Sequence, residues 1–191
     1  MRILSKSIIA VLVVLLFAAP AMSQANLGLF GVGAKVGYVD PEDIDATFGF
    51  GAVADLGKIK PNLGLEAELG YWSKSYDMFG LDASLSAISI AASAKYLFAM
   101  QGSNIQPYAG GGLGFHIFKA KAEYMTYHPT TFEQVKEEES DSETKIGFHI
   151  NGGAMMELSP QMTGFAELRY ALISDVNTLS LMAGVIYSLK K

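Results

Sequence analysis

The fold is decided by a stretch that alternates strictly between two kinds of residue, LGLEAELGYWSK at residues 63–74. From Leu63 to Tyr71 the odd positions carry leucine, alanine or tyrosine, whereas the even positions from Gly64 to Lys74 carry glycine, glutamate, tryptophan or lysine. Successive side chains of a β-strand point to opposite faces. A period of two over this length therefore predicts a strand whose two faces meet different surroundings.

The same alternation recurs along the chain in runs of about ten residues, separated by stretches that contain turn-forming residues. Eight such runs are recognisable, at residues 29–39, 46–56, 62–74, 84–98, 106–119, 145–157, 162–172 and 178–188. Alternating runs joined by short links are typical of antiparallel strands in an up-and-down order. The sequence therefore predicts an all-β fold of eight antiparallel strands, with short links at one end and longer ones at the other.

The two faces of these runs differ in polarity. One face is apolar, while the other collects charged residues among glycine, alanine and serine. In a water-soluble barrel the apolar face would be the core. In a membrane barrel it would meet lipid, and the charged face would line the lumen. Alternation alone leaves both interpretations open.

Three features favour the membrane interpretation. The small residues of the charged face suit a narrow interior, and the charges on that face nearly balance, as buried charges must. The aromatic residues of the apolar face gather near the ends of the runs, where interfacial girdles form. These aromatic residues are Tyr38, Phe48, Tyr71, Tyr96, Phe98, Tyr170 and Tyr187. We therefore predict an eight-stranded antiparallel up-and-down transmembrane β-barrel, and the alternative is a secreted soluble lipocalin-like carrier of a small hydrophobic ligand.

The composition narrows the functional classes. The chain has 191 residues, of which 50% are hydrophobic and only 17% charged, and it contains no cysteine. The lack of cysteine excludes a disulfide framework, a thiolate zinc site and a cysteine nucleophile. A formal net charge of −5 argues against binding to nucleic acid.

Residues 1–23 have the pattern of a secretory signal peptide. Arg2 and Lys6 precede an apolar run at residues 8–19, and small residues follow at Ala21 and Ser23. Twelve helical residues cover about 18 Å, which is too short for a hydrocarbon core of about 30 Å. We predict an exported protein with a signal peptide at 1–23 and a barrel domain at 24–191; an uncleaved anchor helix is the alternative.

Eight strands enclose an interior just wide enough for side chains to fill. We expect the inward charged residues to form a paired ionic network: Lys35, Asp55, Glu66, Glu68, Lys95, Lys145, Glu157, Glu167 and Arg169. Such a network is either a structural plug or part of a gated conduit or proton path. His116 and His149 share the inward face, but neither has the spacing of a metal motif, so we predict no metal and no cofactor.

The longest link, residues 120–144, is strongly acidic. Between Thr131 and Glu143 it carries the carboxylates Glu133, Glu137, Glu138, Glu139, Asp141 and Glu143. An acidic extracellular loop of this kind can contact anionic lipopolysaccharide through bridging cations or dock a basic partner. It can equally be a solvated loop tip, because runs of charge usually stay in water.

Three stretches carry a family resemblance: QPYAGGGLG at 106–114, GFAELRY at 164–170 and NTLSLMAGVIY at 177–187. With them the chain resembles the small bacterial outer-membrane β-barrel superfamily, of the OmpA/OmpX and OmpW-like eight-stranded type. The resemblance implies location in the outer membrane, contact with outer-membrane lipid and lipopolysaccharide, insertion by the barrel-assembly machinery, and a monomer.

The chain departs from the enzymes of that superfamily. Outer-membrane lipid A deacylases carry a His-x-Ser pattern, whereas here His149 is followed two positions later by Asn151. We therefore expect a non-enzymatic barrel with a structural, surface-interaction or small-apolar-solute role.

Overall fold

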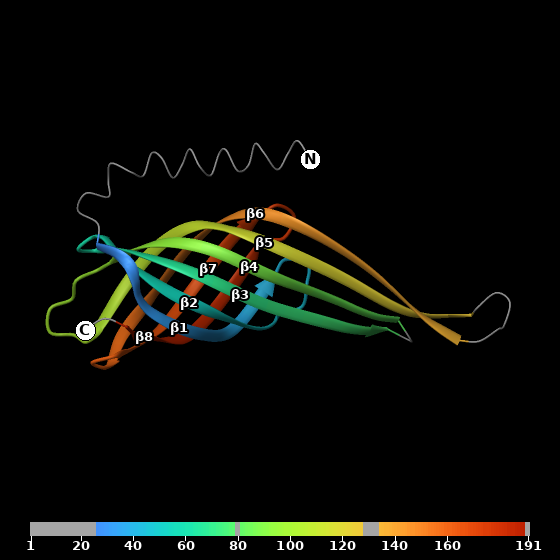
Figure 1. Cartoon of the computed structure of the whole chain (residues 1–191), viewed down its shortest axis with the longest axis horizontal. Coiled ribbons are helices and arrows are strands. Elements are labelled where there is room, and N and C mark those ends of the chain that lie inside the picture. Colours follow the sequence, from blue (N-terminus) through green and yellow to red (C-terminus); the bar gives the residue numbers. More distant parts are fainter. Residues whose placement is uncertain (1–25, 79–80, 128–133, 190–191) are drawn as a thin grey trace.

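The structure, a computed structural model, describes residues 26–78, 81–127 and 134–189, which form a closed antiparallel barrel (Figure 1). Within these residues the strands are β1 (Asn26–Pro41), β2 (Thr47–Lys60), β3 (Leu63–Met78), β4 (Leu81–Leu97), β5 (Ile105–Tyr127), β6 (Gln134–Ser159), β7 (Met162–Ile173) and β8 (Thr178–Ser188). Each strand pairs with the next one, and β1 pairs with β8 from Gly31↔Ser188 to Pro41↔Thr178. The predicted all-β, eight-stranded, up-and-down barrel is thereby confirmed. The predicted signal peptide lies outside the described residues.

The apolar face of every strand points away from the barrel axis. On β8, Leu181 is 57% exposed while its neighbour Met182 is 7% exposed. On β7, Leu168 is 53% exposed while Glu167 is only 1% exposed. Because a soluble domain buries such leucines, a continuous belt of outward apolar side chains requires lipid as its surroundings.

The aromatic residues of the outward face form two groups near opposite ends of the barrel. Tyr38 packs edge-on against Phe48 with their ring centroids 6.3 Å apart, close to the end from which β5 and β6 project. Tyr96 and Phe98 pair at 5.1 Å near the opposite end. The members at the first end are Tyr38, Phe48, Tyr71 and Tyr170, and those at the second are Tyr96, Phe98 and Tyr187. Both groups stand where the girdles of a membrane barrel are expected.

Strands β5 and β6 are much longer than predicted. Together with β3 and β4 they extend beyond the other four strands and form an arm, whose tip is the β5–β6 hairpin (Figure 1). Residues 120–127 and 134–144, expected in a loop, are paired strands whose register runs on from Phe118↔Glu143 to Tyr127↔Gln134. The apolar pattern fades there because neither face of the arm meets lipid. Glu137, Glu138, Glu139, Asp141 and Glu143 therefore lie on a strand rather than in a loop, while Glu133 lies outside the described residues.

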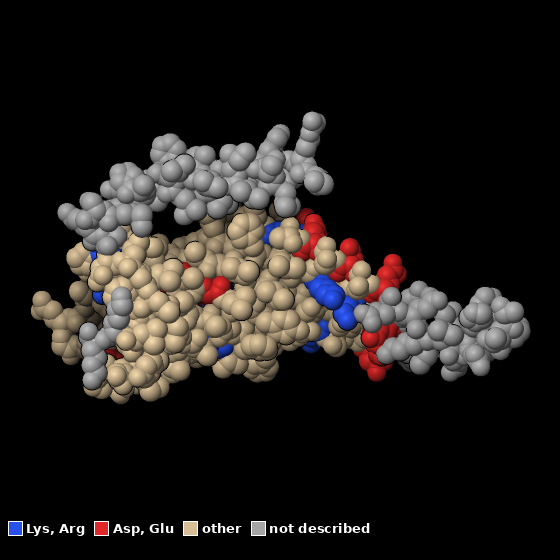
Figure 2. Space-filling model, viewed as in Figure 1, with Lys and Arg blue, Asp and Glu red and all other residues tan. Residues whose placement is uncertain are grey.

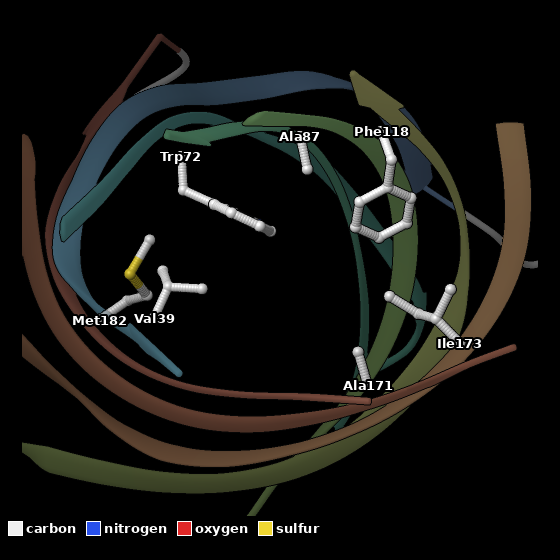
Figure 3. Close-up of a cluster of buried hydrophobic side chains, with 7 residues drawn as sticks. All are labelled: Val39, Trp72, Ala87, Phe118, Ala171, Ile173 and Met182. Carbon is white, nitrogen blue, oxygen red and sulfur yellow. The ribbon is translucent and has the colours of Figure 1, made fainter. Parts of the chain in front are cut away.

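The barrel interior holds two apolar clusters. The larger one lies near the arm end of the barrel, and Figure 3 shows its side chains pointing inward. It comprises Val39, Trp72, Ala87, Phe118, Ala171, Ile173 and Met182. The smaller one, nearer the opposite end (the turn end), comprises Val53, Phe165 and Ile186, with Met155 packed against it. The charged residues of the interior lie between these clusters.

Candidate functional site in the barrel interior

Glu167 is the centre of a buried polar cluster. Its Oε2 is 2.9 Å from Lys95 Nζ and accepts hydrogen bonds from Tyr108 Oη at 2.9 Å and Asn151 Nδ2 at 2.8 Å. Its Oε1 accepts a hydrogen bond from an Arg169 NH2 group at 2.9 Å. With 1% of its surface exposed, this carboxylate exchanges all of its water contacts for protein donors, as a buried charge requires.

The ion pairs extend from Glu167 across the barrel. Lys35 and Arg169 both contact Glu68, and Lys95 Nζ lies 2.6 Å from Glu66 Oε1. Lys35 Nζ also lies 3.7 Å from Glu167 Oε1. The layer thus holds three permanent cations and three carboxylates, all buried. Formal neutrality allows so many charges in one layer, because an uncompensated buried charge would cost several kcal/mol.

Four strands supply these six side chains, and their parity on each strand is the reason they meet. Glu66 and Glu68 are two apart on β3, and Glu167 and Arg169 are two apart on β7, so each pair projects from one face. Glycines opposite the large side chains provide the space. A Cβ on Gly153 would lie 2.8 Å from the Tyr108 hydroxyl, closer than real contacts allow.

A histidine–serine pair flanks the ionic layer. His149 Nε2 and Ser93 Oγ are 2.7 Å apart, and both residues are buried. His116 stacks on Phe118 with ring centroids 6.4 Å apart, and its Nε2 has no hydrogen-bond partner among the described residues. Both histidines and Arg169 line a cavity of about 70 Å³, which is room for a few water molecules.

Three of the residues grouped with the network lie elsewhere. Lys145 stands at the arm end, 3.1 Å from Asp175 and 3.2 Å from Glu143. Asp55 accepts a hydrogen bond from the backbone of Gly57 at the turn end, where Glu157 is exposed. These three have the inward parity but sit too close to the ends of the barrel to reach Glu167. Glu66 and Lys95 form the inner wall of a vestibule of about 610 Å³ that opens at the turn end.

Tyr108, Asn151 and Ser93 belong to the cluster but were not grouped with it from the sequence, because they are uncharged. The sequence does indicate that they point inward, because Ser93 lies two residues from Lys95 on β4 and Asn151 lies two residues from His149 on β6. In the described part of the chain, no three His, Asp or Glu side chains converge as a metal site would require. Ser93 and His149 are 2% and 4% exposed, so this pair lies within the barrel and not on its outer wall.

The comparisons with known proteins agree with the fold. The sequence profile of a family described as outer membrane protein beta-barrel domain matches residues 9–188. Neisserial surface protein A is 22% identical, with a TM-score of 0.58 over 84% of this chain and 97% of its own. A major outer membrane protein from Thermus thermophilus is 13% identical, with a TM-score of 0.62 over 84% and 98%. Ail of Yersinia pestis, in complex with the heparin analogue sucrose octasulfate, is 18% identical, with a TM-score of 0.54 over 85% and 100%. No curated protein matches the sequence.

Proposed function

The chain belongs to the outer membrane protein β-barrel domain family, and we propose that it is a non-enzymatic barrel with a closed lumen that acts through its extracellular arm. It is a protein of the outer membrane. The chain is exported by a signal peptide at residues 1–23, inserted by the barrel-assembly machinery and works as a monomer among outer-membrane lipid and lipopolysaccharide. The arm end faces outward, since long connections of such barrels are extracellular.

The proposal of a closed lumen rests on the layer of ion pairs around Glu167. Its six ionic side chains fill one level of the interior, and apolar side chains fill the levels on both sides of it. The enclosed cavity of about 70 Å³ is too small for an organic solute, and the charged layer closes the inner end of the 610 Å³ vestibule, so passage of a small apolar solute through the lumen is not favoured. The soluble carrier is not favoured either, because its apolar face would have to be buried.

Planar-bilayer recordings test the closed lumen. We expect the refolded full chain to give no steady conductance, because neither ions nor water can pass the charged layer without breaking its ion pairs. The variant Glu167→Ala, which opens space at the centre of the layer, should give small or flickering currents if it folds. A large steady channel in the wild-type protein would overturn this part of the proposal.

The arm supports a surface-interaction role. β6 pairs with β7 only from Gly147↔Ile173 onward, so residues 134–146 of β6 pair with β5 alone and present an open strand edge. The exposed carboxylates of Glu139, Asp141 and Glu143 alternate along this edge and share one face. An open edge accepts an extended segment as an additional strand, and the acidic face selects a basic one. The preferred partner is therefore a protein with an extended basic segment.

A pair of synthetic peptides tests this role. Ten residues of alternating lysine and threonine should bind the full chain in detergent, measured by fluorescence anisotropy, whereas alternating glutamate and threonine should not. Replacing residues 122–139 by Asn-Gly, a hairpin turn between the paired Lys121 and Ser140, should strongly weaken binding while the barrel still folds, because it removes Glu139 and shortens the open edge to residues 140–146. Equal binding of both peptides, or unchanged binding to the shortened variant, would refute the role.

A further inference from the structure

The outward face of β4, β5 and β6 changes character at the base of the arm. Cross-strand register places residues of these three strands in rows, each row two residues beyond the last. Going outward, the rows are Ile90–Phe115–Ile146, Ile88–Ile117–Thr144, Ser86–Lys119–Ser142 and Ser84–Lys121–Ser140. Two rows that face lipid are thus followed directly by two rows that consist of a central lysine between two serines.

Alternation along each strand fixes the direction of these side chains. Phe115 and Ile117 are exposed on the lipid-facing side, and Lys119 has the same parity on β5, so it projects outward as well. Rows two residues apart are separated by about 7 Å along the strand. The two serine–lysine rows therefore lie within one or two rows of the apolar belt, at the level of the headgroups of the outer leaflet.

We propose that the six residues of these rows, Ser84, Ser86, Lys119, Lys121, Ser140 and Ser142 (the Ser–Lys patch), bind phosphate groups of lipopolysaccharide. A lysine ammonium attracts a phosphate as a compact charge, and serine hydroxyls on both sides donate hydrogen bonds to its oxygens. The position next to the apolar belt selects a phosphate carried on an anchored glycolipid. This inference is independent of the partner proposed for the arm.

The neighbouring charges limit the patch on its outer side. The next row pairs Asp82 with Glu123, and the acidic edge of β6 follows on the other face of the arm. Figure 2 shows basic side chains gathered at the base of the arm with acidic side chains beside them. Carboxylates at this distance repel a phosphate, so the patch admits phosphates at the membrane surface and disfavours anions farther out.

Binding of purified lipid A to the full chain in a zwitterionic detergent tests the proposal, with native mass spectrometry or anisotropy of labelled lipid as the readout. We expect K119Q/K121Q to weaken binding of lipid A with two phosphates by about 25-fold, because one basic residue near an anionic membrane surface contributes about fivefold. Dephosphorylated lipid A should bind the wild type and this variant equally. K119R/K121R should retain most of the affinity.

K58Q/K60Q is the matched control, since Lys58 and Lys60 are also exposed and two residues apart but lie at the turn end of β2. It should bind phosphorylated lipid A like the wild type, and gel mobility shows that each variant is folded. Unchanged binding by K119Q/K121Q, an equal loss with dephosphorylated lipid A, or an equal loss in K58Q/K60Q would overturn the proposal. Competition by inorganic phosphate at millimolar concentration would show a free-anion site and also overturn it.

Discussion

Substituting Glu167 by glutamine changes one charge at the centre of the ionic layer and hardly changes its shape. The amide still accepts hydrogen bonds from Tyr108 and Asn151, but three buried cations then face two carboxylates. Removing one member of a buried ionic network costs on the order of 3–5 kcal/mol, because the remaining charge is left without compensation. We expect Glu167→Gln to lower the free energy of unfolding by about this amount.

A second substitution tests the cause of that loss. Removing Arg169 together with Glu167 leaves two one-to-one pairs, Lys35 with Glu68 and Lys95 with Glu66. E167Q/R169M is therefore neutral again, and it should be more stable than the sum of the two single variants predicts, by roughly 1–3 kcal/mol. Lys145→Gln is the control, because its partners Glu143 and Asp175 are exposed at the arm end and its loss should change stability little.

Urea unfolding in lipid vesicles measures these differences. The fluorescence of Trp72, the single tryptophan of the chain, reports on the interior cluster, and the mobility of unheated samples on gels reports on barrel closure. A Glu167→Gln variant that unfolds at the same urea concentration as the wild type would refute the account of the layer. So would a double variant whose loss equals the sum of the single losses.

Two further substitutions test the packing and the lipid contact. Gly153→Ala should lower the free energy of unfolding by about 1–3 kcal/mol in the same urea titration, because the new Cβ would lie 2.1 Å from the carbonyl oxygen of Ala166. Gly152→Ala is the control and should be neutral, since a Cβ at Gly152 would lie 3.7 Å from its nearest neighbouring atom. Leu168→Arg, at the middle of β7 and 53% exposed, should cost about 2–4 kcal/mol and slow insertion into vesicles, since it places a charge in hydrocarbon; insertion at the wild-type rate and stability would contradict the lipid-facing assignment.

The sequence predicted the face that each residue occupies better than it predicted the position of that residue along the barrel axis. Lipid enforces the period of two wherever the wall crosses the membrane, so the parity of Leu168, Leu181, Glu167 and their neighbours follows from alternation alone. Height along the barrel depends on strand tilt and stagger, which alternation does not encode. For that reason Lys145, which has inward parity, was grouped with residues that it does not contact.

The arm and the Ser–Lys patch lay beyond the reach of periodicity. From Lys119 outward the chain leaves the membrane, the outward face of the strands becomes polar, and the sequence pattern no longer separates strand from loop. Lys119 even occupies a position of the apolar parity, which makes it the residue that marks the edge of the lipid-facing belt. The inward apolar clusters, which include Trp72 and Phe118, could not be predicted either, because the pattern sorts positions only into an apolar face and a charged face.

The orientation of the two faces is tested most directly by spin labels at single cysteines, which this cysteine-free chain accepts without background. Leu181→Cys and Met182→Cys are adjacent on β8 and should differ completely in vesicles. The label at 181 should be relaxed strongly by oxygen, which partitions into lipid, and hardly by a water-soluble nickel chelate. The label at 182 should be reached poorly by both reagents. Strong access of the nickel chelate to position 181, or of lipid-dissolved oxygen to 182 alone, would contradict a barrel with its apolar face toward lipid.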